Sequence, residues 1–271
     1  MNPVSVSQGN SPIVLGLPHT GTFVPDGIMC KLNENGRKLA DTDWHIDQLY
    51  DGVLDSATTV RANFHRYVID ANRDPSGVSL YPGQNTTTLV PLTDFDGSEI
   101  WNAPPTPVEI DARRTAFHAP YHAALKAELD RVREVHGVAI LYDCHSIRSS
   151  IPFLFEGTLP DFNIGTNDGT TCASTIEHLV ERACSAVADP RDPTYSQITN
   201  GRFKGGWTTR QYGRPDQSIH AIQMELAQST YLATETPPWD YDEEKATALR
   251  YRLSHVLMAL EGVAPSLREK T

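Results

Sequence analysis

The sequence predicts an α/β protein in which polar side chains follow the ends of buried strands. An apolar run, residues 138–141, comes directly after Gly137 and has the length and composition of a buried strand. This run leads into Asp143 and His145, and open α/β sheets bind their ligands at the carboxyl ends of strands. We therefore expect the chemistry of the protein at this edge of the sheet.

Composition and charge narrow the class of protein. The chain has 271 residues, enough for one substantial core, and 21% of them are charged, as in ordinary soluble proteins. Its formal net charge of -11 disfavours nonspecific binding to nucleic acid or to an anionic membrane. No apolar segment is long enough to span a bilayer, and residues 1–11 lack the apolar middle of a signal peptide. We expect a cytoplasmic protein with a single domain over residues 1–271 and no nucleic-acid or membrane partner.

Other short apolar runs predict further strands, among them residues 58–61 and 152–155. Three runs lead into side chains that could carry chemistry: His19 after residues 13–17, Asn72 and Arg73 after residues 67–70, and Glu225 near the end of residues 218–226.

Periodic apolar residues predict helices between these strands. A capping box at Thr106 with Pro107 at the first helical position begins a long helix that Gly137 ends. We expect Pro120 to kink this helix. Further helices are predicted after Asp43, over residues 176–187 and over residues 246–260.

Three segments lack this periodicity. Residues 76–105 are rich in Gly, Pro and Thr and predict a long loop, which in compact domains is often a functional lid. Residues 161–169 read as a polar turn region. Residues 200–217 combine glycine pairs and hydroxyls with four cations, which favours a flexible, anion-binding loop: Arg202, Lys204, Arg210 and Arg214.

The residue types at the predicted strand ends indicate metal-assisted hydrolysis. Two histidines and a carboxylate with an open fourth position make a catalytic zinc site. Such a metal polarises a carbonyl and lowers the pKa of its water, while a separate carboxylate moves the proton to the leaving nitrogen. An arginine can hold a substrate carboxylate with two parallel hydrogen bonds. Taken singly, each residue also fits a structural role, such as a helix cap for Asp41 or Asp43.

Other catalytic arrangements find less support. Cys144 and His145 are neighbours on a strand, so their side chains point to opposite faces and cannot form a dyad. The chain has no G-x-S-x-G elbow, and residues 201–206 lack the spacing of a phosphate-binding loop. His118 and His122 have no HExxH pattern around them, which favours surface or hydrogen-bonded histidines.

Seven stretches in order across nearly the whole chain resemble the N-formylglutamate amidohydrolases, also called N-formylglutamate deformylases. These stretches are LPHTGTFVP (17–25), DTDWHIDQLYD (41–51), RYVIDANRDPSG (66–77), LYPGQNTTTLVPLTDFDG (80–97), LYDCHSIRSSIPFLFEG (141–157), NGRFKGGWTTRQYGRP (200–215) and MELAQSTYL (224–232). The resemblance implies kinship with zinc carboxypeptidases and aspartoacylases, and a mixed β-sheet flanked by helices in a zinc-carboxypeptidase-like, phosphorylase/hydrolase-like fold. It also implies hydrolysis of N-formyl-L-glutamate to formate and L-glutamate, late in histidine degradation.

The resemblance also implies roles for single residues. His19 and His145 look like the two histidine ligands of zinc or another divalent metal, and Glu225 looks like the catalytic base. Asn72 and Arg73 are similar to the pair that holds the substrate carboxylate in those relatives.

The carboxylate ligand departs from the pattern of the relatives, which carry Glu three residues after the first histidine. This chain has Thr22 there, so we assign the carboxylate ligand to Asp43 and keep Asp41 and His45 open.

The remaining assignments concern the surroundings of the metal and the substrate. Arg210 or Arg214 is expected to help Arg73 bind the glutamate carboxylates, and Asp143 to orient a metal ligand. Two other functions stay open: deacylation of another N-acyl amino acid, and metal-free binding of an amino acid.

Overall fold

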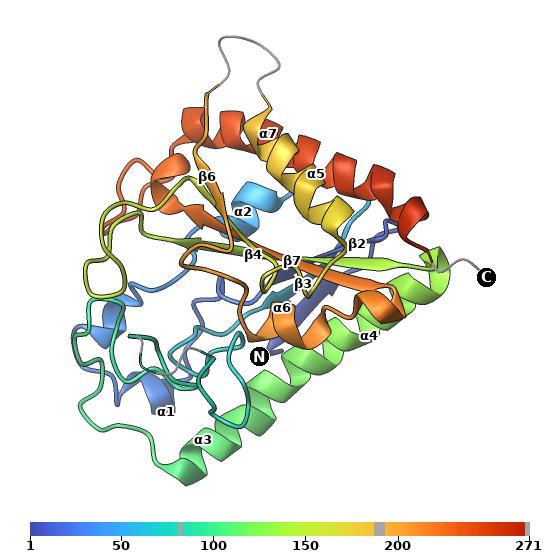
Figure 1. Ribbon diagram of the computed structural model, residues 1–271. Helices are drawn as coiled ribbons and strands as arrows, with labels where there is room; N and C mark the ends of the chain where they lie inside the picture. Colours follow the sequence, from blue (N-terminus) through green and yellow to red (C-terminus); the bar gives the residue numbers. More distant parts are fainter. Residues whose placement is uncertain (81–82, 84, 187–192, 269–271) are drawn as a thin grey trace.

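Seven strands form one mixed sheet in the computed structural model, which describes residues 1–80, 83, 85–186 and 193–268 (Figure 1). In spatial order the strands are β1 (Val4–Ser7), β3 (Thr58–Ala62), β2 (Ile13–Leu17), β4 (Ala139–Ile147), β7 (Ile219–Ala227), β5 (Phe162–Gly165) and β6 (Gln197–Thr199). Strands β3, β2, β4 and β7 are mutually parallel. β1 runs antiparallel to β3, and β5 runs antiparallel to β7. The predicted α/β fold with a mixed sheet is confirmed.

Helices cover both faces of the sheet (Figure 1). Helices α5 (Ser174–Ser185) and α7 (Glu243–Val263) pack on one face, together with the short α2 (Ile46–Tyr50). Helices α4 (Ala119–His136) and α6 (Trp207–Tyr212) lie on the other. Both helices predicted over residues 176–187 and 246–260 are confirmed for the residues described, and Asp242 caps the start of α7.

The two faces of β4 and β7 carry different kinds of side chain, because side chains alternate along a strand. Ile140, Tyr142 and Cys144 belong to the apolar core under α5 and α7. Leu141 belongs to the core on the α4 face, and Asp143 and His145 continue on that face. In the register of β4 with β7, these two residues lie opposite Gln223 and Glu225. One strand pair therefore supplies a core on one side and a cluster of polar side chains on the other.

Two of the predicted strands are wrong. Residues 67–70 form a buried irregular segment, so Asn72 and Arg73 do not follow a strand. Residues 152–155 form a turn whose Leu154 and Phe155 join a small apolar cluster. An apolar run predicts burial, and periodicity alone cannot tell a strand from a buried turn.

Other elements were missed by the sequence prediction. Strand β5 lies inside residues 161–169, which were predicted as turns because Asn163 and Gly165 interrupt the apolar pattern. The edge strands β1 and β6 have only four and three residues, and neither contains a continuous apolar run. Helix α6 begins at Trp207 within the segment predicted as a loop.

The long helical segment begins and ends as predicted. Thr106 and Glu109 form the capping box of α3 (Pro107–Arg113), and Gly137 has a left-handed backbone at the end of α4. Between α3 and α4 lies one π-helical turn, Arg114–His118, immediately before Pro120. Proline has no N–H to give to the preceding turn, so the helix widens there.

Residues 76–105 contain no helix or strand where the structure describes them, as predicted for a long loop; a role as a lid stays a prediction. The four cysteines are not disulfide-bonded, and Cys144, Cys172 and Cys184 are buried. No helix in the described part of the chain has the length and hydropathy to cross a membrane. The assignment of residues 1–271 to a single domain also stays a prediction.

Candidate active site

Three neighbouring parallel strands bring His19, His145 and Glu225 to one edge of the sheet. His19 lies two residues beyond the end of β2, and His145 and Glu225 lie opposite each other near the ends of β4 and β7. The carboxyl ends of parallel strands coincide, so three local sequence signals meet in space.

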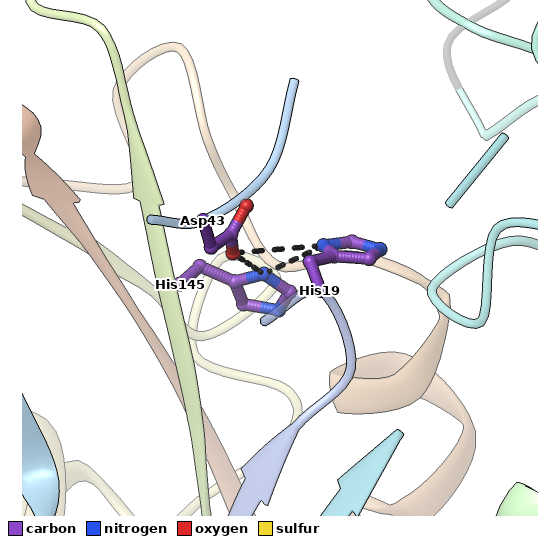
Figure 2. A group of neighbouring side chains, drawn as sticks. All are labelled: His19, Asp43 and His145. Carbon is purple, nitrogen blue, oxygen red and sulfur yellow. Dashed lines mark hydrogen bonds and ion pairs between the residues drawn. The ribbon is translucent and has the colours of Figure 1, made fainter. Parts of the chain in front are cut away.

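Asp43 joins the two histidines from the segment that precedes α2. Its backbone N–H donates to the carbonyl of His19 over 3.1 Å, which holds the two residues side by side. The side chains of His19, Asp43 and His145 point toward one another (Figure 2).

The two other candidate ligands lie elsewhere. The carboxylate of Asp41 accepts a hydrogen bond from the Tyr67 hydroxyl over 2.8 Å. The Nε2 of His45 lies 2.9 Å from the carbonyl of Trp239. The structure therefore places Asp43, rather than Asp41 or His45, beside His19 and His145.

The three converging atoms have the spacing of metal ligands. The Nδ1 atoms of His19 and His145 are 3.2 Å apart, and Oδ2 of Asp43 lies 3.7 Å and 3.2 Å from them. Ligands about 2.0–2.1 Å from a tetrahedral zinc ion stand roughly 3.4 Å from one another. Two imidazole lone pairs and a carboxylate oxygen at these distances also need a cation or a proton between them. The three residues therefore fit a divalent metal ion.

Both histidines have acidic neighbours on their outer nitrogens. Nε2 of His19 lies 2.7 Å from Oδ1 of Asp70, and Nε2 of His145 lies 3.3 Å from Oδ1 of Asp143. A carboxylate there keeps the proton on Nε2 and leaves the Nδ1 lone pair for a metal. Burial opposes the charged imidazolium, but the carboxylates of Asp143 and Asp43 prevail and raise the pKa of His145 well above its ordinary value.

Arg66 fixes the remaining oxygen of Asp43. Its Nη2 donates to Oδ1 over 2.6 Å, and both side chains are buried. Burial would raise the pKa of Asp43, but the charges of Arg66 and His19 outweigh it and hold this pKa below its ordinary range. Asp43 therefore stays ionised, as a metal ligand must be.

The pKa of Glu225 is shifted in the opposite direction to the pKa of Asp43. Burial is the main cause that raises the pKa of Glu225 to about 7, although the neighbouring His145 opposes this effect. A carboxylate with a pKa near neutrality can both accept and return a proton, which is what a general base needs.

A pocket opens over this cluster, lined by His19, His145 and Glu225 and by three arginines. These arginines are Arg66, Arg73 and Arg202. Arg73 donates to the carbonyl and hydroxyl of Thr87 over 3.0 Å and 2.8 Å. Arg202 donates to the carbonyls of Leu154 and Asn85, both over 3.2 Å.

The structure does not bring Arg210 and Arg214 to this pocket. Nε of Arg210 donates to the carbonyl of Gly205, and Nη1 of Arg214 donates to the carbonyls of Arg210 and Gly213. Both side chains hold the backbone around α6 instead.

Asn72 lines the pocket, and its contact with a substrate carboxylate stays a prediction. Its Nδ2 is 3.1 Å from Nε2 of His145, and its Oδ1 accepts the N–H of Thr208 over 2.9 Å. Asn72 thus lies between His145 and the first turn of α6.

Comparison with known proteins places the chain in one family. Residues 11–232 match the N-formylglutamate amidohydrolase family. The chain belongs to this family. N-formylglutamate deformylases of Pseudomonas putida and Pseudomonas aeruginosa are 44% and 40% identical over 260 residues, covering 95% of each chain. The crystal structure of N-formylglutamate amidohydrolase from Ralstonia eutropha JMP134 aligns with a TM-score of 0.77 and 26% identity, covering 99% of both chains.

As a member of the N-formylglutamate amidohydrolase family, the chain is a hydrolase. The family resemblance seen in the sequence is therefore confirmed, whereas the relation to zinc carboxypeptidases stays a prediction.

Sequence reasoning gave no specific role at this site to four polar residues: Arg66, Asp70, Arg202 and Gln223. Of these, Arg202 was noted only as one of the four cations of the predicted anion-binding loop. Gln223 could have been found because it lies two residues before Glu225 and so shares its face of the strand. Asp70 is the last residue of the predicted strand 67–70, two positions before Asn72, but nothing in the sequence connects Asp70 to His19.

Proposed function

We propose that this chain hydrolyses N-formyl-L-glutamate to formate and L-glutamate. The observation that carries the proposal is the convergence of His19, Asp43 and His145 beside Glu225, in a member of the N-formylglutamate amidohydrolase family. The relatives named N-formylglutamate deformylases cover 95% of the chain, which supports the same substrate.

His19, Asp43 and His145 would hold zinc or another divalent metal. The bound metal supplies Lewis acidity, which polarises an amide carbonyl and lowers the pKa of water. Arg66 keeps Asp43 ionised, and Asp70 and Asp143 keep the imidazoles in the tautomer that exposes Nδ1.

Glu225 is assigned the proton transfers. Its carboxylate accepts a proton from the water whose oxygen bonds to the formyl carbon. It then gives this proton to the amide nitrogen as the C–N bond breaks, and the second proton of the water moves to the released amine, so that formate and the ammonium group of glutamate form. The raised pKa of Glu225, about 7, suits both transfers.

Arg73 and Arg202 are assigned the two carboxylates of the substrate. Arg66 also lines the pocket, but its buried guanidinium lies 2.6 Å from Asp43, whereas Arg73 lies 3.9 Å from its acidic neighbour Asp70. Arg73 and Arg202 come from two separate segments of the pocket wall, as two separate carboxylates require. In this proposal they take the role that the sequence analysis gave to Arg73 with Arg210 or Arg214.

The test is formate release from a panel of N-formyl and N-acetyl amino acids, with and without a chelator, together with metal analysis. We expect turnover of N-formyl-L-glutamate, one equivalent of metal, and activity that is lost to the chelator and restored by Zn²⁺. Turnover mainly of another N-acyl amino acid would instead make the chain a different deacylase. Tight glutamate binding without metal or turnover would make it a binding protein.

The assignment of Glu225 has its own test. Glu225→Gln should abolish turnover while the metal content stays at one equivalent; surviving activity would place the base elsewhere. A cytoplasmic location and a place late in histidine degradation go with the proposed function.

A further inference from the structure

Gln223 connects the side chain of Glu225 to the backbone before α6. Its Nε2 donates to Oε2 of Glu225 over 3.0 Å, and its Oε1 accepts the N–H of Gly206 over 2.7 Å. Gln223 and Glu225 are both buried, with exposed fractions of 4% and 7%. Among the described residues, this is the one side chain that hydrogen-bonds the Glu225 carboxylate.

The orientation of the Gln223 amide follows from its partners. A backbone N–H can only donate, so the amide oxygen must face Gly206. The amide NH₂ then faces Glu225, where it can only donate. Gln223 therefore satisfies one defined oxygen of Glu225, Oε2, and leaves Oε1 for other partners.

Gly206 is itself held in place from the opposite side. A Cβ atom at this position would lie 2.3–2.6 Å from the amide atoms of Asn72, a distance that only glycine avoids. The same amide of Asn72 accepts the N–H of Thr208 over 2.9 Å. The backbone N–H that orients Gln223 is thus fixed against a residue that already touches His145.

From this chain of contacts we propose that Gln223 is a positioning residue for the reaction. It reserves Oε2 of Glu225 and presents Oε1 for proton exchange with water and with the amide nitrogen of the substrate. The inference rests on the proposed function, because it takes Glu225 as the base. We expect Gln223 to matter for the rate, because proton transfer is sensitive to where the base is placed.

The main test is Gln223→Met, which keeps the length and volume of the side chain but removes both hydrogen bonds. We expect kcat for N-formyl-L-glutamate to fall about 10- to 100-fold, because the base is no longer held, while KM changes less than about threefold. Metal content and the thermal unfolding midpoint should stay near those of the parent protein. Gln197→Met on the edge strand β6 is the control, since it also removes hydrogen bonds of a glutamine.

A second variant, Gln223→Glu, keeps an acceptor for Gly206 but cannot donate to Glu225 when ionised. It should lose kcat as Gln223→Met does.

Three results would overturn the inference. An unchanged kcat would show that Glu225 needs no support, and a raised KM with kcat kept would make Gln223 a substrate ligand. Loss of metal or of the fold in both Gln223 variants would give it a purely structural role. Retained turnover in Glu225→Gln is a separate outcome, since it contradicts the proposed base whatever Gln223 does.

Discussion

Nε2 of His19 lies 2.7 Å from Oδ1 of Asp70, and both side chains are buried. Asp70 is held in turn by the backbone N–H of Asn72, which donates to the same oxygen over 2.8 Å. Burial raises the pKa of Asp70, but the charges of His19 and Arg73 prevail and hold it well below the ordinary value. An ionised carboxylate therefore fixes the His19 ring and directs its Nδ1 toward Asp43 and His145.

Removal of this carboxylate should weaken metal binding without removing a ligand. For Asp70→Ala we expect metal affinity to fall about 10- to 100-fold, because the His19 ring loses its orientation and part of its basicity. Competition with a chromophoric chelator measures this affinity. Asp74→Ala is the control, since Asp74 bonds to Ser76 and not to a histidine. Equal affinity in Asp70→Ala and the parent protein would contradict the assigned role.

The buried ion pair of Arg66 and Asp43 predicts a large loss of stability when Arg66 is replaced. In metal-free protein, Arg66→Met leaves Asp43 buried without its cation and should cost about 3–5 kcal/mol of unfolding free energy. Urea denaturation measures it. The matched control is Arg61→Met, because Arg61 pairs with Asp47 over the same 2.6 Å but both side chains are about 40% exposed. There we expect about 0–1 kcal/mol. Similar losses in both variants would refute the prediction.

His122 predicts how stability depends on pH. Burial is the main cause that lowers the pKa of His122 to about 3 in the folded protein, from 6.5. The unfolded chain therefore binds a proton between these values that the folded chain does not, so stability is lost as pH falls below 6.5. The contribution of this residue is at most about 1.4 kcal/mol per pH unit.

The variant His122→Gln can keep the contacts with the Ala71 carbonyl and the Tyr212 hydroxyl but cannot titrate. Unfolding free energies at pH 7, 6 and 5 should fall less steeply in this variant than in the parent protein. The control is His255→Gln on α7, which should keep the parent slope. A slope unchanged by His122→Gln would show that other groups dominate acid unfolding.

The positions of the arginines predict which of them recognises the substrate. Arg202→Met should lower kcat/KM for N-formyl-L-glutamate about 10- to 100-fold, the cost of losing a charged hydrogen-bond partner. Arg210→Met should have a smaller effect, because Arg210 does not line the pocket. N-formyl-L-glutamine, with one carboxylate, then shows which carboxylate Arg202 holds. A larger loss in Arg210→Met than in Arg202→Met would restore the assignment made from the sequence.

The positions of His19, His145 and Glu225 could be predicted because each follows a local signal. An apolar run that stops in a polar side chain marks a strand end, and parallel neighbouring strands bring such ends together. The same reasoning failed for residues 67–70, whose apolar side chains pack without forming a strand.

The positions of the residues that surround His19, His145 and Glu225 depend on how the loops fold. No local sequence pattern encodes this. Asp43 reaches His19 through a backbone hydrogen bond between two separate loop segments. Asp41, two positions away, serves Tyr67 instead. In the cationic segment, the direction of the chain before α6 brings Arg202 to the pocket and turns Arg210 to the backbone.

The alternation of side chains along β4 also limits how this enzyme can change over time. One extra residue before Cys144 would turn the thiol toward His19 and Asp43 and the His145 imidazole into the apolar core. Such an insertion would disrupt both the active site and the apolar core, so a variant with one extra residue in this strand would not stay functional. Length variation among descendants of this protein should therefore accumulate in the loops, and libraries that aim at new substrates should vary the loops as well.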